Sequence, residues 1–219
     1  MATRQLLSEL TAAYAQRSGR AVSITSVGGV DAAKRVQAGE AFDVVILASD
    51  AIAKLVDSGH LRANSMTDLV HSGVAVAVRT GTPLPDISSE DAVRQAVLAA
   101  PTLGYSTGPS GVALANRFER WGIAEHIKDR IVTAPPGVPV GSLVAKGEVA
   151  LGFQQLSELI HVDGITIVGP LPPAIQITTT FSAAMTSGCT RPAEVQDLLD
   201  FMASNEAIAA KRRQGMEPA

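Results

Sequence analysis

The sequence is poor in residues that carry thiol, metal or stacking chemistry. Cys189 is its single cysteine, which excludes an internal disulfide and any site built from several thiolates. Aromatic residues make up only 4% of the chain, too few for a platform that stacks nucleic-acid bases. The four histidines are scattered without a His-Glu-x-x-His pattern, and neither a phosphate-binding P-loop motif nor a G-x-S-x-G nucleophile motif occurs. We therefore expect no metal ion and no cofactor, and we assign no catalytic residue.

Long hydrophobic runs and a strong excess of charge are also missing. No apolar run approaches the roughly 20 residues that cross a bilayer, so insertion into a membrane is not expected. The 18 basic and 21 acidic residues give a net charge of −3. The one basic cluster, Lys211 to Arg213, lies near the end of the last predicted helix, where it would complement the helix dipole rather than bind nucleic acid. With 46% hydrophobic residues, the chain has enough apolar side chains for a substantial core.

What the sequence does contain is an alternation of apolar strands and amphipathic helices, which predicts an α/β fold with mainly parallel sheets. Ser88 and Asp91 stand at the spacing of a helix-capping box, so Ser88 is the expected cap of the helix that follows. The predicted strands are residues 21–27, 42–49, 73–79, 102–106, 130–134, 149–154, 165–169 and 174–185. The predicted helices are residues 4–19, 28–40, 50–59, 88–100, 139–147, 155–160, one that opens at 109, and two that close the chain.

Two of these strands suggest how the chain is divided. The run 174–185 is long and follows a proline-rich segment rather than a helix, so we interpret it as a crossing between two domains. The run 73–79 would cross in the opposite direction. This predicts a first domain of residues 1–77 and 182–219, a second domain of residues 78–181, and a ligand cleft between them.

Three strand-to-helix turns are rich in glycine, hydroxyl or amide residues. Backbone N–H groups at such helix starts bind anions without a lysine, because they lack partners within the helix and carry the positive end of the helix dipole. Two other interpretations stay open: Ser110 could simply cap its helix, and the glutamines could cap the next helix and face water. The candidate ligand-binding residues in these turns are Gly28, Gly29, Val30, Ser106, Ser110, Gly111, Gln154 and Gln155.

These motifs resemble the extracellular solute-binding proteins related to the periplasmic molybdate-binding protein. The resemblance lies in "VGGVDAAKRVQAGEAFDVVILASDAIAKLVDSG", "YSTGPSG", "LVAKGEVALGFQQLSEL" and "VGPLP", and it spans nearly the whole chain. It implies a two-domain, two-crossover binding fold of the second type, in which hydroxyls and backbone N–H groups capture a small anion. It also implies a monomer in the periplasm that delivers its ligand to a membrane importer, as substrate-binding proteins of ABC transporters do.

This chain departs from the molybdate binders at two places. They carry serines in the turn that here reads Val27, Gly28, Gly29 and Val30, and a tyrosine where this sequence has Gln155. Fewer hydroxyl donors and a glutamine amide favour a larger organic carboxylate over molybdate. At Ser110 and Gly111 the chain keeps the matching residues, and at Val138 the resemblance implies a backbone N–H contact with the ligand.

The start of the chain departs from the family as well. Family members begin with a strand, whereas here Met1 already stands at the mouth of the first helix. We therefore expect the natural chain to begin upstream, with a strand and an export signal. If it does not, Met1 and Ala2 would line the cleft.

Two other functions remain open at this stage. The broader family includes members similar to aconitate isomerase, which would need an acid and a base such as Tyr105, Glu158 or a histidine in the cleft. A sensor domain could use the same cleft, but it would need a signalling appendage, and none is visible here. Replacing Gly111 by proline is expected to weaken anion binding while leaving the fold intact.

Overall fold

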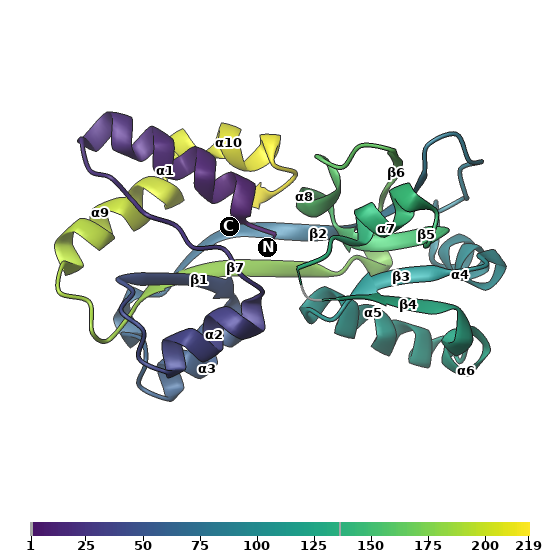
Figure 1. Ribbon diagram of the computed structural model, residues 1–219, viewed down its shortest axis with the longest axis horizontal. Helices are drawn as coiled ribbons and strands as arrows, with labels where there is room; N and C mark the ends of the chain where they lie inside the picture. The colour runs from purple at the N-terminus through teal and green to yellow at the C-terminus, as the bar shows by residue number, and fades with distance from the viewer. Residues whose placement is uncertain (1, 136) are drawn as a thin grey trace. The chain divides into compact units, whose positions relative to one another are not determined.

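The chain forms two compact units in the computed structural model, which describes residues 2–135 and 137–219. Unit 1 comprises Met1–Ser72 and Thr179–Ala219, and unit 2 comprises Gly73–Thr178. The chain leaves unit 1 within strand β2 (Thr67–Arg79) and returns at the start of strand β7 (Thr178–Met185). Figure 1 labels the α-helices of both units and strands β1 to β7. A two-domain mixed α/β architecture is therefore present, as the sequence predicted.

The remaining elements of unit 1 are α1 (Arg4–Ser18), α2 (Gly29–Gln37), β1 (Val44–Ala48), α3 (Ser49–Asp57), η1 (Ala63–Ser65), α9 (Pro192–Ala203), η4 (Asn205–Ala207), α10 (Ile208–Arg213) and β8 (Glu217–Pro218). Those of unit 2 are α4 (Glu90–Ala99), β3 (Leu103–Ser106), α5 (Pro109–Arg120), α6 (Ala124–Ile127), η2 (Lys128–Arg130), β4 (Ile131–Ala134), α7 (Val140–Lys146), β5 (Leu151–Gln155), α8 (Leu156–Leu159), β6 (Ile165–Pro170) and η3 (Pro173–Ile175). Among the described residues, no helix combines the length and the hydrophobicity that crossing a membrane requires.

Unit 1 is a three-layer arrangement of helices on both faces of a sheet (Figure 1). Strand β7 lies between β1 and β2 and runs antiparallel to β1. Because successive residues of a strand point to opposite faces, Ala183 and Met185 pack in the core with α1 and α9, whereas Ala184 packs with α2 and α3. Each face of the sheet therefore has its own hydrophobic core.

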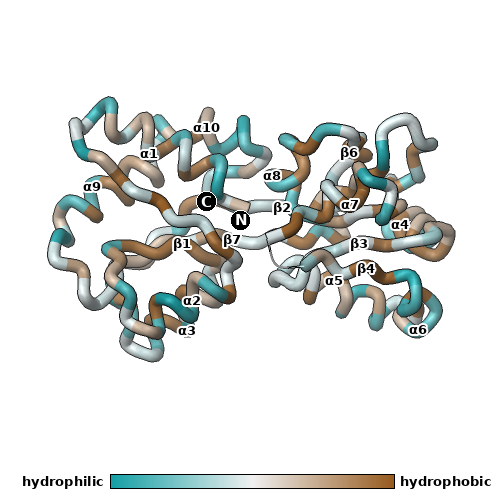
Figure 2. The backbone as a smooth tube through the Cα atoms, in the orientation of Figure 1, coloured by the Kyte–Doolittle hydropathy of each residue, from teal (hydrophilic) through white to brown (hydrophobic). Residues whose placement is uncertain are grey.

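Unit 2 has the same layering around strand β3, which pairs in parallel with β4 and β5. The larger residues Val74, Val76 and Val78 of β2 pack in the core that includes residues of α4 and α5, while Ala75 and Ala77 face the side of α8. Figure 2 shows hydrophobic and hydrophilic residues interspersed along surface helices such as α2 and α6. The apolar faces of such helices complete the cores.

Helix α7 packs very closely on the sheet of unit 2, and two glycines make this possible. Gly104 of β3 and Gly152 of β5 stand side by side in the parallel register. A Cβ atom at Gly104 would lie 3.2 Å from Val140 of α7 and 2.7 Å from Val149, which follows the helix, and one at Gly152 would lie 2.5 Å from Val144 of α7. Both positions therefore require glycine, and α7 is held at a fixed place beside the ends of the strands.

The structure corrects three details of the sequence interpretation. Residues 21–27 alternate like a strand but form none, because no strand of the described sheet pairs with them and all of them are exposed or half-buried. The cap of α4 is Ser89 rather than Ser88, since the Ser89 hydroxyl accepts a hydrogen bond from the Ala92 N–H at 3.1 Å. The sheets were predicted to be mainly parallel, but the parallel pairs are those around β3, whereas the two crossing strands form antiparallel pairs, β7 with β1 and β2 with β5 and β6.

Candidate functional site

The turns that carry most of the candidate residues meet at one edge of the sheet in unit 2. Strands β3, β4 and β5 are parallel, so their carboxyl ends lie at the same edge. Each strand then runs through a turn into a helix, namely α5, α7 and α8 respectively. The structure thus brings together the segments that contain Ser106, Ser110, Gly111, Val138, Gln154 and Gln155.

Helix α5 begins with two N–H groups available for a ligand. Its N-cap is Gly108, and its first residue, Pro109, has no N–H to donate. The first helix-closing bond runs from the Val112 N–H to the Gly108 carbonyl at 3.1 Å. Within the described part of the chain, the N–H groups of Ser110 and Gly111 therefore have no hydrogen-bond partner. Ser110 is not the cap: it lies inside the first turn, is buried, and makes no capping bond.

Gly111 fixes the position of this helix start. A Cβ atom at Gly111 would lie 1.7 Å from the Ser106 carbonyl oxygen and 3.2 Å from the ring of Tyr105. Tyr105 in turn packs against Phe118 of α5, with ring centroids 6.1 Å apart. The end of β3 and the start of α5 are therefore in direct contact, which holds the two N–H groups in place.

Gln154 is committed to a neighbouring helix rather than free for a ligand. Its side chain is 3% exposed, and its Oε1 accepts a hydrogen bond from the Gly141 N–H at 3.3 Å, at the start of α7. Gln155 is also buried and stands directly before α8. Ser157 of α8 is buried too, and its hydroxyl has no hydrogen-bond partner in the described structure. The sequence analysis did not name Ser157, because a serine inside an amphipathic pattern is not distinctive.

Glu158, in α8 at this edge of the sheet, is an acidic residue whose pKa is shifted by its surroundings. Burial raises the pKa of its carboxyl, and a side-chain hydrogen bond from Gln154 acts in the opposite direction. Burial also raises the pKa of Tyr105, whose phenol therefore remains protonated. A raised pKa makes the carboxylate a stronger base than that of an ordinary glutamate, which favours a role in proton transfer.

Val138 lies in the turn between β4 and α7, and its N–H is already used. It donates to the Pro135 carbonyl at 3.0 Å, while the side chain is 37% exposed. The described structure therefore offers the Val138 side chain, rather than its N–H, to a ligand.

The candidate residues of unit 1 lie at and near the start of α2. Gly28 is the N-cap and Gly29 the first residue, while Val30 is exposed. Asp31 also stands in this first turn, and its carboxylate occupies the positive end of the helix dipole. An anion at α2 would have to compete with that charge, so α5 is the stronger anion site of the two.

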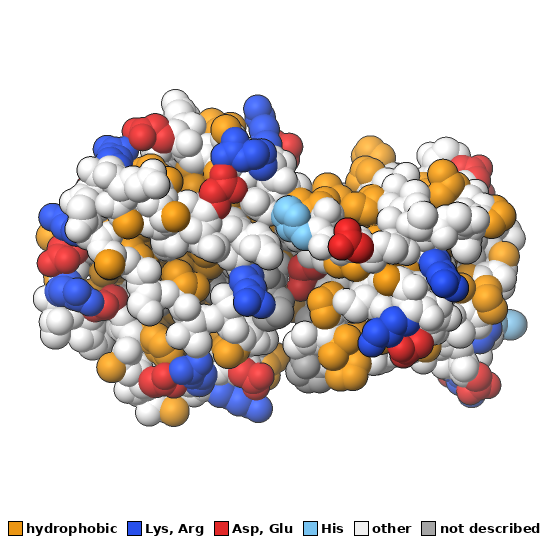
Figure 3. Space-filling model, turned by 45° about the horizontal axis from the view of Figure 1, so that its top comes forward, with side chains coloured by type: hydrophobic (Ala, Val, Ile, Leu, Met, Phe, Trp, Pro, Cys, Tyr) orange, Lys and Arg blue, Asp and Glu red, His pale blue; other side chains and the backbone are white. Residues whose placement is uncertain are grey.

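Of the two residues expected to line a cleft at the chain start, only Ala2 belongs to the described residues. Ala2 is buried in the core of unit 1 with Leu6 and Leu10, and Met1 lies outside the described residues. No group of three His, Cys, Asp or Glu that could hold a metal ion occurs in residues 2–135 and 137–219. On the face in Figure 3, acidic and basic side chains are interspersed.

Comparison with known proteins places these features in a family. Residues 1–217 match the family model described as "Bacterial extracellular solute-binding protein". An aconitate isomerase from Pseudomonas sp is 39% identical over 218 residues, covering 96% of this chain and 82% of that protein.

Solved structures show the same fold. The periplasmic molybdate-binding protein of Azotobacter vinelandii superposes with a TM-score of 0.79 at 21% identity, covering 98% of this chain and 94% of that one. The binding protein AgtB of A. tumefaciens R10, solved with agropinic acid, gives a TM-score of 0.75 at 14% identity, covering 100% of this chain and 80% of that one. At these identities the likeness establishes the two-domain fold of periplasmic binding proteins.

Proposed function

Because the chain belongs to the bacterial extracellular solute-binding proteins and has the molybdate-binding type of fold, we propose that it captures a small organic carboxylate. The observation that carries this proposal is the start of α5, where the N–H groups of Ser110 and Gly111 lack partners. Such a helix start binds a carboxylate through two hydrogen bonds and the helix dipole. Capture in the periplasm by a monomer and delivery to a membrane importer complete the proposal.

The side chains around this helix start favour a ligand with a carbon skeleton over molybdate. Val112, in the first turn of α5, is 56% exposed, and Val138 is also partly exposed at the same edge. An apolar contact beside N–H donors suits a molecule that carries both methylene groups and carboxylates. The relative that acts on aconitate and the fold neighbour that binds agropinic acid are consistent with this class of ligand.

The proposal is tested by a thermal-shift screen with molybdate, tungstate, sulfate, phosphate and a panel of di- and tricarboxylates. A carboxylate at 100 times its Kd should add about 2.7 kcal/mol to the free energy of unfolding. A shift with molybdate or tungstate alone would contradict the organic ligand, and no shift with any anion would contradict the site.

A matched pair of variants at Val112 tests the position of the ligand. Val112→Asp should leave the fold intact or slightly more stable, because an acidic residue in the first turn complements the helix dipole. The same negative charge should weaken carboxylate binding about tenfold or more through repulsion. Val112→Asn has nearly the same shape without the charge and should bind close to wild type. Equal affinity of the two variants would place the anion elsewhere.

A second function, isomerisation of a small unsaturated carboxylate, is favoured by the 39% identity to an aconitate isomerase and by Glu158. In this proposal the Glu158 carboxylate removes a proton from one carbon of the substrate and, now protonated, returns it to another carbon as the double bond moves, so that the enzyme neither gains nor loses a proton. The raised pKa makes this carboxylate a stronger base than that of an ordinary glutamate. NMR would follow the interconversion of cis- and trans-aconitate. We expect Glu158→Gln to abolish turnover while ligand binding, measured by calorimetry, remains. Binding without any turnover in the wild type would leave capture as the function.

A further inference from the structure

One edge of strand β1 in unit 1 is open. Among the residues that the structure describes, β1 pairs with β7 alone. The Asp43 carbonyl accepts a hydrogen bond from the Thr186 N–H at 3.1 Å, and these two residues continue the register of β1 and β7. Because hydrogen-bonded pairs alternate along an antiparallel ladder, the N–H and C=O groups of Val44 and Ile46 point away from β7. Within residues 2–135 and 137–219 these groups have no other partner, so they are available to a further strand.

Residues 21–27 lie near this open edge and are unpaired as well. They run without helix or strand from α1 to α2 (Figure 1), and their backbone makes no hydrogen bond in the described structure. Val22 packs against the core formed with α1 and α9, as two residues of β1 do. At the other end of the segment, a Cβ atom at Gly29 would lie 3.7 Å from the side chain of Leu47 in β1. The segment therefore shares a core with β1 and ends beside its carboxyl-terminal half.

The helices on either side of residues 21–27 determine where a further strand belongs. Helix α1 packs on the face of the sheet that carries Ala183 and Met185, whereas α2 packs on the opposite face with Ala184. Crossovers between parallel strands are right-handed, so successive crossovers on opposite faces run in opposite directions across the sheet. Because α2 leads from residues 21–27 towards β1, a strand that precedes α1 lies on that same side. β7 occupies the other edge of β1, which leaves the position between residues 21–27 and β1.

The surroundings of this position set the chemistry of its occupant. Helices α1 and α9 cover one face of the sheet of unit 1, and α2 and α3 cover the other. A parallel strand buried on both faces is a continuous apolar run, as the five residues of β1 are. Ala2 and Thr3, directly before α1, are buried, and Ala2 belongs to the core that Val22 contacts. The backbone before α1 therefore leads out of the interior of unit 1.

We propose that unit 1 takes up one further parallel strand between residues 21–27 and β1, and that an apolar segment directly preceding α1 in the protein supplies it. This strand pairs with the open N–H and C=O groups of Val44 and Ile46. The aconitate isomerase relative supports the proposal, since the match covers 82% of that protein and leaves further residues outside it. The proposal does not depend on the ligand at α5, because α5 belongs to unit 2.

Hydrogen exchange followed by NMR tests the open edge in the 219-residue chain. The amide protons of Val44 and Ile46 should exchange at least about tenfold faster than those of Val45 and Leu47, which pair with β7. The probe is the peptide Lys-Lys-Val-Val-Ile-Leu-Ala-Lys-Lys, which places the apolar run of β1 between solubilising lysines. Added in excess, it should slow exchange at Val44 and Ile46 about tenfold or more. The matched control peptide has proline in place of isoleucine and should have no effect, because proline is not accommodated within a central strand.

Slow exchange at Val44 and Ile46 in the chain alone, or no slowing by the peptide, would overturn the open position. Analytical ultracentrifugation accompanies the measurement, because protection of these amides in a dimer would assign the position to a second copy and overturn the proposed occupant.

The source of the strand is tested on a protein extended by the codons upstream of α1. Its Val44 and Ile46 amides should be protected without any peptide, and proline in the middle of the added apolar run should remove this protection. An upstream reading frame without such a run, or fast exchange at both residues in the extended protein, would contradict the proposal. None of these outcomes bears on the organic carboxylate at α5, which is tested by Val112→Asp.

Discussion

Replacing Gly111 by alanine is expected to lower the free energy of unfolding by about 3 kcal/mol, the upper end of the usual cost of overpacking. The added Cβ atom would lie 1.7 Å from the Ser106 carbonyl oxygen, and this neighbour is backbone that cannot rotate away. The start of α5 must then move away from the end of β3. Urea unfolding followed by circular dichroism measures the loss, and calorimetry measures the accompanying loss of carboxylate affinity.

Gly108 provides the control for this variant within the same turn. A Cβ atom at Gly108 would make only an ordinary contact, 3.6 Å from the Ser106 hydroxyl, and the backbone there has φ of −75°. Gly108→Ala should therefore cost less than about 1 kcal/mol, the value of a helix-cap preference. Equal stability of Gly111→Ala and wild type would contradict the contact between α5 and Ser106. The contact also overturns our expectation that Gly111→Pro keeps the fold intact, because proline carries the same Cβ atom.

The sequence predicted most elements because burial leaves a pattern in the order of residues. Strand β1 was predicted from its continuous apolar run, and α5 from apolar residues at helical spacing after Gly108. The prediction failed at residues 21–27, where the alternation is present but a partner strand is not. Pairing is a tertiary property, so local periodicity alone cannot establish it.

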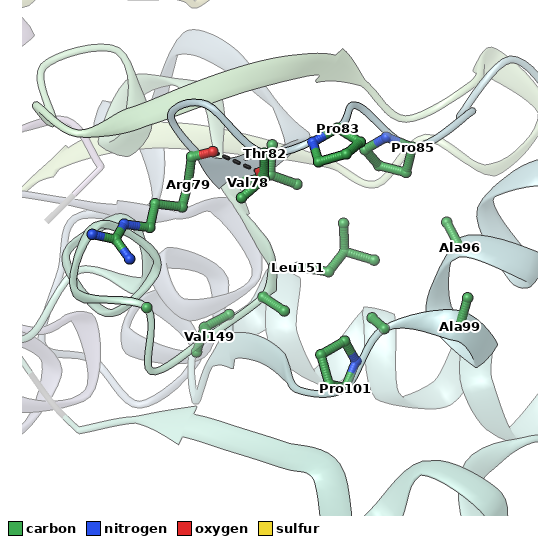
Figure 4. Close-up of a pocket in the computed structure, with 13 residues that line it drawn as sticks. Val78, Arg79, Thr82, Pro83, Pro85, Ala96, Ala99, Pro101, Val149 and Leu151 are labelled. Carbon is green, nitrogen blue, oxygen red and sulfur yellow. Dashed lines mark hydrogen bonds between the residues drawn. The ribbon is translucent and has the colours of Figure 1, made fainter.

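The candidate site was predictable only where the signal is local. A glycine-rich turn before a helix marks the N–H groups of Ser110 and Gly111 in the sequence itself. That Gln154 is held by Gly141, 13 residues earlier, depends on how α7 packs on the sheet. The pocket lined by Pro83, Ala99 and Pro101 (Figure 4) was not predicted either, because the ends of β2 and α4 and the start of β5 come together only in the fold.

Lys211 shows most clearly how a local pattern can mislead. We expected it to complement the dipole of the last helix, as Arg212 and Arg213 do from the surface, where they pair with Glu217 and Glu9. Instead Lys211 is 1% exposed, and across residues 2–135 and 137–219 its ammonium has no hydrogen-bond or ion-pair partner. An unpaired polar group in the interior costs folding free energy, because it gives up its hydration without compensation.

Replacing Lys211 by methionine, which keeps a long apolar stem, is therefore expected to raise the free energy of unfolding by about 1 to 3 kcal/mol. Lys146, an exposed lysine of α7, supplies the control, and Lys146→Met should change stability by less than about 0.5 kcal/mol. Urea unfolding of both variants at neutral pH measures the difference. A destabilised Lys211→Met would mean that the ammonium is compensated in the folded state.

The burial of Lys211 also leads to a second, independent prediction, which concerns how the free energy of unfolding depends on pH. Burial lowers the pKa of Lys211 below its ordinary value of 10.5, so between the two pKa values the unfolded chain binds more protons than the folded one. Stability must then rise with pH through that interval, because protons favour the state that binds more of them. Below the lowered pKa both states are protonated, and the contribution of Lys211 no longer changes. Relative to Lys211→Met, the wild type should therefore gain stability as pH approaches 10.5, and a constant difference between the two proteins at every pH would contradict the buried, unpaired ammonium.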